Sequence, residues 1–581
     1  MARGTLHHFG ASSTAFLLRA FMTLTLAAIL MLPGCGGGDV DKPAPPAAKD
    51  NAKPAPTGAI ELVFPYGSEK KTWLTEATEA FNAQQHKTAS GKPIFVRPIP
   101  MGSGESIEEV LSGRLQAHLI SPASGAFIKL GNAQSVTKSG KPLVGSTKEL
   151  VLSPVVIAMW KPMAEALGWG KKPVGWAEIL ALVRDPKGWG AHGMPQWGKF
   201  KFGHTHPQFS NSGIISLFAE VYAATGKTRD LTLEDIAKPA TSEFLGAIEK
   251  AVVHYGSSTG FFGKRLFDGG PEYLSAAVLY ENMVIESYDK QKYPSMPFPV
   301  VAVYPKEGTF WSDHPVGIVQ REWVGKEHQE AAEKYIEYLL AKPQQERAMV
   351  HGFRPADPSV AIAAPIDKDH GVDPAEPKTT LEVPAVEVMD AIIKLWKQHK
   401  KHANVVLVLD TSGSMNQGGR LENARKGALE LVNMLGDEDV LSFLQFDNDL
   451  NWVHRNLRMA DNRAKMTQTI QTMIATGGTS LYDAVDEAYR YVGNNPDPER
   501  ITAVIVLTDG EDRNSKLRLE QLLASVKSDA ERRPIRVFTI GYGQEANGKI
   551  LLQIAEQTQA TFYKGTPENI REVFKDISTF F

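Results

Sequence analysis

Residues 405–414 have the sequence VVLVLDTSGS, an apolar run that ends in an acid and is followed by hydroxyl and glycine residues. Consecutive apolar residues bounded by turn-forming residues are typical of a strand buried on both faces of a parallel sheet. A second such run, residues 503–508, leads into Asp509, and Thr479 lies in a polar segment just before an amphipathic helical pattern. These patterns predict an open α/β sheet in the C-terminal part of the chain.

The carboxyl ends of parallel strands share one edge of an open α/β sheet, and ligands bind in the crevice there. We therefore expect two carboxylates and three hydroxyls at one place: Asp410, Ser412, Ser414, Thr479 and Asp509. All five are hard oxygen donors, which suit Mg²⁺, Mn²⁺ or Ca²⁺ better than a soft metal. So few protein ligands leave coordination positions open, and an acidic group of a protein partner can fill them.

The five residues resemble the metal-ion-dependent adhesion site (MIDAS) of von Willebrand factor A (VWA) domains, over residues 404–581. The resemblance implies a doubly wound, Rossmann-like fold and metal-dependent protein binding. The alternating patterns predict strands near 404–410, 439–446, 451–457, 501–508, 535–541 and 561–564. They predict helices near 420–435, 461–475, 480–494, 516–529, 548–558 and 567–579. The second and third strands are too close in sequence for a crossover helix, so we expect an antiparallel hairpin.

The chain of 581 residues is too long for one hydrophobic core, so several domains are expected. With 43% hydrophobic and 22% charged residues, the composition is that of a soluble globular protein. The net charge of -3 gives no electrostatic reason to expect nucleic-acid binding.

The N-terminus has a basic flank and an apolar segment, residues 20–32, that is shorter than the roughly 20 residues a membrane-spanning helix needs. This pattern predicts a secretion signal over residues 1–34. Residues 32–35 (LPGC) resemble a bacterial lipobox, which implies that Cys35 carries a lipid. Cys35 is the only cysteine, so the chain can form no disulfide within itself. An ordinary signal peptide with a chance cysteine is the alternative.

Residues 35–58 are rich in Gly, Pro, Ala and Lys, which predicts a lipidated cysteine followed by a flexible tether. No later run is long and apolar enough to span a bilayer, so the chain is not itself a permease. We expect it in the cell envelope, lipid-anchored to a membrane and facing the periplasm or the cell exterior.

Residues 59–356 contain strands that end in small or hydroxyl-bearing loops, several of which begin helices. Helix starts present unpaired N–H groups and a positive dipole end, which suit an anion or a polar ligand. The pattern of residues 151–160 predicts a strand that could cross to a second lobe. Residues 300–304 and 316–319 are predicted to form the return crossing to the first lobe. This order resembles type 2 periplasmic solute-binding proteins, which implies a two-lobed domain with its ligand between the lobes.

The residues expected to bind the solute are Ser68, Ser103, Gly104, Ser124, Ser210, Asn211, Ser212 and Tyr280. Hydroxyl-rich helix starts suit an oxyanion. Five tryptophans in the second lobe (Trp160, Trp169, Trp176, Trp189 and Trp197) leave open a sugar or cation ligand that stacks on indole rings, although core packing also explains them.

Residues 357–383 are rich in Pro, Ala and Asp, which predicts a linker. The spacing of apolar residues in 384–403 predicts a connecting amphipathic helix. The leading hypothesis is a membrane-anchored binding protein with a solute cleft and a metal-dependent VWA domain. We expect no enzyme, because no nucleophile elbow, zincin motif or Walker loop is present. The alternatives are a receptor that delivers solute to a separate permease, and an adhesion or assembly protein without a small ligand.

Overall fold

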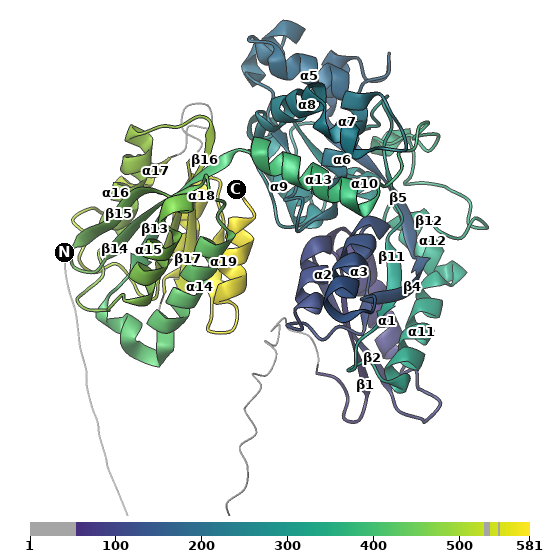
Figure 1. Cartoon of the computed structure of the whole chain (residues 1–581), viewed down its shortest axis with the longest axis horizontal. Helices are drawn as coiled ribbons and strands as arrows, with labels where there is room; N and C mark the ends of the chain where they lie inside the picture. Colours follow the sequence, from purple (N-terminus) through teal and green to yellow (C-terminus); the bar gives the residue numbers. More distant parts are fainter. Residues whose placement is uncertain (1–53, 528–534, 544–545) are drawn as a thin grey trace, which may run out of the picture. The chain divides into compact units, whose positions relative to one another are not determined.

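The computed structural model describes residues 54–527, 535–543 and 546–581 (Figure 1). The predicted signal peptide, Cys35 and most of the predicted tether lie outside the described residues. Within the described ranges, no helix combines the length and the apolar composition needed to cross a membrane.

The C-terminal domain is built on a six-stranded sheet with the strand order β15-β14-β13-β16-β17-β18. The strands are β13 (His402–Asp410), β14 (Val440–Phe446), β15 (Leu450–Arg458), β16 (Arg500–Thr508), β17 (Arg536–Tyr542) and β18 (Phe562–Gly565). All neighbours are parallel except β14 and β15, which form the predicted antiparallel hairpin. The doubly wound fold class is therefore confirmed.

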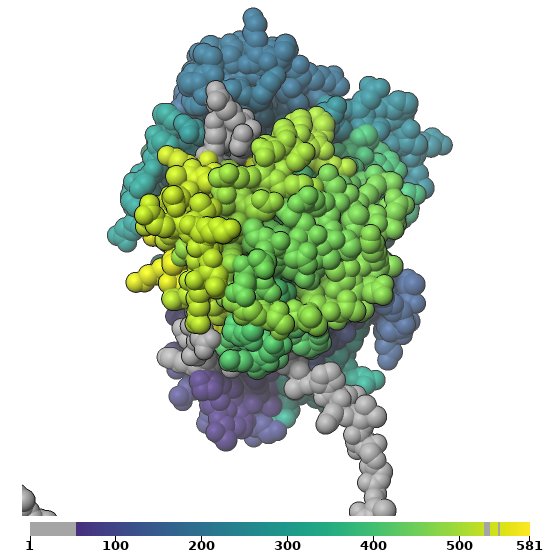
Figure 2. Space-filling view, turned by 90° about the vertical axis from the view of Figure 1, so that its left-hand side faces the viewer, coloured from purple at the N-terminus to yellow at the C-terminus, as the bar shows by residue number. Residues whose placement is uncertain are grey.

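Alternate residues of the central strand β13 face opposite layers of helices, which is why its sequence is continuously apolar. Val406 and Val408 pack with α16 (Leu481–Asn494), α17 (Leu519–Val526) and α18 (Gly548–Gln557). Val405 and Leu407 belong to the core that includes α14 (Arg420–Met434), α15 (Met459–Gln471) and α19 (Ile570–Ser578). Figure 1 shows the helices of this domain with the sheet, and Figure 2 shows one face of the domain in green to yellow.

The first lobe of the N-terminal domain contains a parallel pair of strands and a three-stranded antiparallel sheet. Its strands are β1 (Ile60–Gly67), β2 (Ile94–Met101), β3 (Leu119–Ile120), β4 (Val144–Glu149) and β11 (Pro315–Val319). Its helices are α1 (Lys71–Ala83), α2 (Ser103–Leu111), α3 (Gly125–Ser139), α11 (Lys326–Leu340) and α12 (Lys342–Val350). The bridge between Tyr66 and Ser121 joins β1 to the end of β3.

The predicted crossing strand is β5 (Val151–Trp160). Its first residues pair with β12 (Arg354–Pro355), and its later residues pair with β8 (Ala276–Tyr280) and β9 (Val300–Val303) in the second lobe. The chain returns to the first lobe between β10 (Trp311–Ser312) and β11. The second lobe also holds β6 (Phe202–Gly203), β7 (Val252–His254), α4 (Lys161–Leu167), α5 (Trp176–Arg184), α6 (Asn211–Thr225), α7 (Leu233–Ala237), α8 (Pro239–Glu249), α9 (Thr259–Tyr273) and α10 (Glu281–Glu286).

The segment predicted as a linker is held against the N-terminal domain. Arg354 forms a bidentate ion pair with Glu281, with both N–O distances at 2.7 Å, and also donates to the carbonyls of Pro374 and Glu376. Further along, the Leu381 amide donates to Thr309 at 2.8 Å.

The predicted amphipathic helix is α13 (Val386–His399). Its buried side chains are Val388, Met389, Ile392 and Trp396. The Trp396 ring packs edge-to-face on His206, with ring centroids 5.0 Å apart, and on Tyr255 at 5.5 Å. This helix is therefore part of the second lobe rather than a free spacer, and only two residues separate it from β13.

A buried charge cluster lies where the chain returns to the first lobe. Lys70 donates to Glu69 Oε1 at 2.7 Å and lies 3.1 Å from the His314 ring nitrogen. Burial alone would raise the pKa of Glu69, but Lys70 and His314 outweigh burial and lower this pKa to about 2. Burial lowers the pKa of His314 to about 4, so its ring is neutral at pH 7.

We predict that Lys70→Met lowers the free energy of unfolding by about 3–5 kcal/mol, because it leaves the Glu69 carboxylate buried without its cation. The double variant Glu69→Gln/Lys70→Met should recover most of this loss. Urea unfolding of the three proteins measures the effect, and the exposed neighbour Lys71→Met is the matched control. A loss equal to that of Lys71→Met would contradict a structural role for the pair.

Candidate functional site

Three loops at the carboxyl edge of the C-terminal sheet are tied together by backbone hydrogen bonds. The Thr476 amide donates to the Thr411 carbonyl at 2.7 Å, and the Gly413 amide donates to the Gly477 carbonyl at 3.0 Å. These bonds join the loop after β13 to the loop before α16.

The third loop, which follows β16, is attached through Asn514. Its side-chain oxygen accepts from the Thr479 amide at 3.0 Å, and its own amide donates to the Thr479 carbonyl at 3.0 Å. The Thr479 hydroxyl lies 3.8 Å from where a Cβ atom would stand on Gly510. Thr479 is therefore brought close to Gly510, the residue after Asp509.

Four of the five predicted metal ligands are linked by a continuous hydrogen-bond network. The Ser412 and Ser414 hydroxyls are 3.0 Å apart, and Ser414 donates to Asp509 Oδ1 at 2.8 Å. Asp410 accepts from the Ser412 amide at 2.8 Å and from the Thr508 hydroxyl at 2.5 Å. Both carboxylates are fully buried.

This donor set fits a hard divalent cation. Burial raises the pKa of Asp410 to about 6, and the neighbouring Asp509 charge adds to this rise, although hydrogen bonds from Ser412 and Thr508 oppose it. Such a pair of buried carboxylates favours a nearby cation. Among the described residues, no cluster of three or more His, Cys, Asp and Glu side chains is arranged to hold a metal. A cation here would therefore depend on the hydroxyls and on water or a partner's oxygen to complete its shell.

The other acids near this edge hold the loops. Asp447 accepts from the Asp449 amide and from the Thr476 hydroxyl. Asp512 accepts from the Tyr482 amide at 3.2 Å. These contacts favour a role in holding the loops over a role as additional ligands.

In the N-terminal domain, hydroxyl side chains gather where four long helices begin. Ser103 begins α2, Ser124 caps α3, Ser210 precedes α6, and Ser258 precedes α9. The first two helices belong to the first lobe and the other two to the second. Each of these serines is almost completely buried.

Hydrogen bonds between these side chains join the two lobes. The Ser124 hydroxyl donates to Asn211 Oδ1 at 2.5 Å, and the Ser68 hydroxyl donates to Ser258 at 2.9 Å. The Gly260 amide, in the first turn of α9, donates to Ser68 at 2.9 Å. The predicted residues of the two lobes therefore meet directly.

The same network continues inside the second lobe. Asn211 donates to the Tyr280 hydroxyl at 3.0 Å and to Ser312 at 3.4 Å. Thr259 contacts the hydroxyls of Ser210 at 3.1 Å and Ser212 at 3.0 Å. Burial raises the pKa of Tyr280, so its hydroxyl is protonated at neutral pH.

Ser103 and Gly104, the two remaining predicted ligand residues, contact backbone groups outside this network. The Ser103 hydroxyl accepts from the Ala123 amide at 2.9 Å. The Gly104 amide donates to the Phe209 carbonyl at 2.9 Å, and a Cβ atom on Gly104 would stand 2.0 Å from the Gln208 carbonyl oxygen. Only glycine allows the first turn of α2 to approach the second lobe this closely.

Sequence reasoning missed Ser258, Thr259 and Ser312. The stretch SSTG at 257–260 before an apolar run repeats the pattern of NSG at 211–213, and this signal could have identified the start of α9. Ser312 lies in a two-residue strand without any recognisable pattern.

The five tryptophans of the second lobe are packing residues. Trp160, Trp176 and Trp189 are fully buried, and the indole nitrogens of Trp160 and Trp189 donate to Leu274 and Ser275. Trp169 donates to the Ala302 carbonyl and Trp197 packs edge-to-face on Trp189. These contacts favour core packing over stacking on a sugar.

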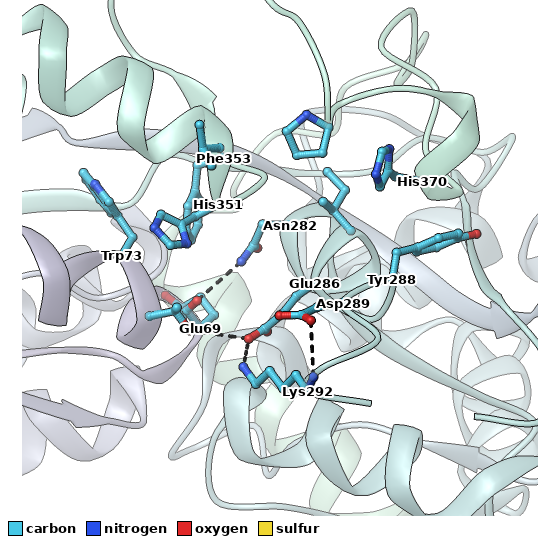
Figure 3. A pocket seen from close by; sticks show the side chains of 14 residues that line it. Glu69, Trp73, Asn282, Glu286, Tyr288, Asp289, Lys292, His351, Phe353 and His370 are labelled. Atoms are coloured by element: carbon cyan, nitrogen blue, oxygen red, sulfur yellow. Dashed lines mark hydrogen bonds and ion pairs between the residues drawn. The ribbon is translucent and has the colours of Figure 1, made fainter. Parts of the chain in front are cut away.

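Figure 3 shows a pocket of about 330 Å³ that is separate from this network. Its walls come from the start of α1, from α10 and from the segment after α12, and include Trp73, Asn282 and His351. None of the eight predicted ligand residues lines it.

We predict that Asp410→Asn stabilises the protein at pH 7 without divalent metal, by on the order of 2 kcal/mol. The folded-state pKa of about 6 lies above the unfolded value, so the cost of ionising Asp410 is absent near pH 4 and grows as the pH rises to about 6. The free energy of unfolding of the wild type and of Asp410→Asn, measured in EDTA at pH 4 and at pH 7, gives this stabilisation. The exposed Asp449→Asn is the control, and equal effects of Asp410→Asn at both pH values would refute the prediction.

Comparisons with known proteins agree with this architecture. The C-terminal residues 404–576 match the family model of the von Willebrand factor type A domain. This region is 30% identical over 175 residues to an uncharacterized protein of Synechocystis, covering 30% of this chain and 40% of that protein. It is 26% identical over 159 residues to inter-alpha-trypsin inhibitor heavy chain H3 of Homo sapiens, covering 26% of this chain and 18% of that protein. The chain thus spans less than half of the length of either relative.

Two solved structures resemble parts of the fold. The sulfate-binding protein SubI of Mycobacterium tuberculosis is 18% identical, with coverage of 54% of this chain and 92% of that chain and a TM-score of 0.37. A von Willebrand factor type A protein of Catenulispora acidiphila is 21% identical, with coverage of 31% and 42% and a TM-score of 0.29.

The family model of the bacterial extracellular solute-binding protein matches residues 62–354, just over half of the 581 residues. These boundaries coincide with the two lobes described above. The chain belongs to the family of bacterial extracellular solute-binding proteins, and it carries a von Willebrand factor type A domain after the solute-binding domain.

Proposed function

We propose that this protein is a lipid-anchored binding protein of the bacterial cell envelope that captures a small oxyanion between its two lobes and a protein carboxylate at its VWA domain. Binding rather than catalysis is proposed because neither site contains a nucleophile paired with a base. The anchor rests on Cys35, the sole cysteine, at the end of the predicted signal peptide.

The observation that carries the solute proposal is the meeting of three helix starts, those of α3 in the first lobe and of α6 and α9 in the second, at one hydroxyl network. Backbone N–H groups at helix starts and serine hydroxyls are donors that suit an oxyanion. A second observation supports it, because the buried Ser121 hydroxyl, at the end of β3, has no hydrogen-bond partner among the described residues. The packing roles of the tryptophans make a stacked sugar the weaker candidate.

At the VWA domain, Asp410, Ser412, Ser414, Thr479 and Asp509 would hold Mg²⁺, or Mn²⁺ or Ca²⁺. The ion would supply a Lewis-acidic position for a carboxylate of the partner protein. The chain's own residues bury the two aspartates, orient Ser414 toward Asp509, and fix the three loops through backbone hydrogen bonds.

The cleft is tested by thermal unfolding with sulfate, phosphate, molybdate and a set of sugars. An oxyanion at about 100 times its Kd should stabilise the protein by about 2.7 kcal/mol, which raises the Tm by about 5 °C. Asn211→Ala should abolish this shift, whereas the exposed Asn495→Ala should keep it. A shift with sugars alone would overturn the oxyanion class. No shift with any solute would favour an adhesion or assembly protein.

The metal site is tested by adding Mg²⁺ to protein freed of metal with EDTA. Mg²⁺ should raise the Tm of the wild type and of Asp449→Asn, but not of Asp410→Asn, because only the last change removes a buried carboxylate from the network. If Asp410→Asn keeps the full Mg²⁺ shift, the ion binds elsewhere.

A further inference from the structure

A cationic side chain already contacts the proposed metal site. Arg420, the first residue of α14, donates from one guanidinium nitrogen to Asp509 Oδ2 at 2.7 Å. Asp509 is fully buried, and the Arg420 side chain is only 17% exposed. A hydrogen bond between a guanidinium and a carboxylate is among the stronger polar contacts in proteins.

The backbone around Arg420 favours this position. Gly418 and Gly419 have φ angles of 56° and 70°, a left-handed conformation that side chains other than glycine rarely adopt, so α14 begins directly at Arg420. On the other side, the Arg420 guanidinium lies 3.9 Å from where a Cβ atom would stand on Gly543, at the end of β17.

Arg420 uses the one Asp509 oxygen that the serine network leaves available. Oδ1 accepts from Ser414, which is itself a proposed ligand, while Oδ2 accepts from Arg420. A divalent ion that drew on Asp509 would therefore meet a positive charge within hydrogen-bonding distance of the same carboxylate. Two cations that share one buried carboxylate repel each other more strongly than they would in water.

We propose that Arg420 sets the ligand preference of the site: it weakens the binding of the divalent ion and strengthens the binding of an anionic group to the loaded site. This inference rests on the proposed metal binding. Two aspartates and a divalent ion sum to zero charge. Arg420 adds a positive charge beside the carboxylate that would hold the ion, and this charge attracts a carboxylate more than it attracts a neutral ligand such as water.

The proposal requires that one substitution shift two affinities in opposite directions. Arg420→Gln should bind Mn²⁺ about tenfold more tightly than the wild type, because it removes a repelling charge next to the ion. The Mn²⁺-loaded variant should bind acetate about tenfold more weakly. A merely structural role of Arg420 would weaken both or leave both unchanged.

The experiment uses full-length protein freed of metal. Titration calorimetry with Mn²⁺ gives the ion affinity, and paramagnetic broadening of the acetate proton signal by bound Mn²⁺ gives the anion affinity. Lys426→Gln, which removes an exposed positive charge from the same helix, is the matched control and should behave like the wild type. Thermal unfolding confirms that each variant is folded.

The outcomes separate the two proposals. The role of Arg420 is supported if Arg420→Gln, but not Lys426→Gln, binds Mn²⁺ more tightly and acetate more weakly than the wild type. It is also supported if only Arg420→Gln binds Mn²⁺. If the wild type binds Mn²⁺ and Arg420→Gln binds it equally well or more weakly, the role of Arg420 is overturned and the metal site stands. If neither the wild type nor Arg420→Gln binds Mn²⁺, both proposals fall.

Discussion

Two carboxylates, Asp410 and Asp509, are buried together at the ends of adjacent central strands, and the surrounding loops are arranged to satisfy them. A buried charge is costly unless hydrogen bonds or opposite charges compensate it. Here the compensation comes from two segments far apart in sequence. Ser414 and Arg420, between β13 and the start of α14, contact Asp509, and the Thr508 hydroxyl at the end of β16 donates to Asp410. These side chains are therefore held by the ends of two sheet strands, and an ion site needs ligands on such supporting elements.

The C-terminal domain could be predicted almost completely from the sequence because its signals are local and long. Each buried strand is a run of apolar residues, and the close spacing of β14 and β15 allows only a hairpin. The approach of the loops that follow β13 and β16 could also be predicted, since the carboxyl ends of parallel strands share one edge. Arg420 could not be identified in this way. An arginine at the start of a helix resembles a solvated surface residue until the fold brings it to Asp509.

The two-lobed domain was harder to predict, for physical reasons. Strands such as β6 and β7 have two or three residues, too few to show an alternating pattern, and they are stabilised by neighbours distant in sequence. Composition alone also does not show where the linker segment is held. Pro, Ala and Asp indicate weak packing, yet the segment is held by Arg354 through backbone carbonyls, which any residue type provides.

The direct hydrogen bonds between the lobes bear on how selective the cleft can be. Ser124 and Asn211, and Ser68 and Ser258, already satisfy one another across the lobes. A solute that used these groups would have to replace those bonds, so its measured affinity would be the difference between two sets of contacts. A weak acceptor gains nothing from such an exchange. If the proposed solute binds here, the hydrogen bonds between the lobes would compete with it, and only a solute rich in acceptor oxygens would displace them.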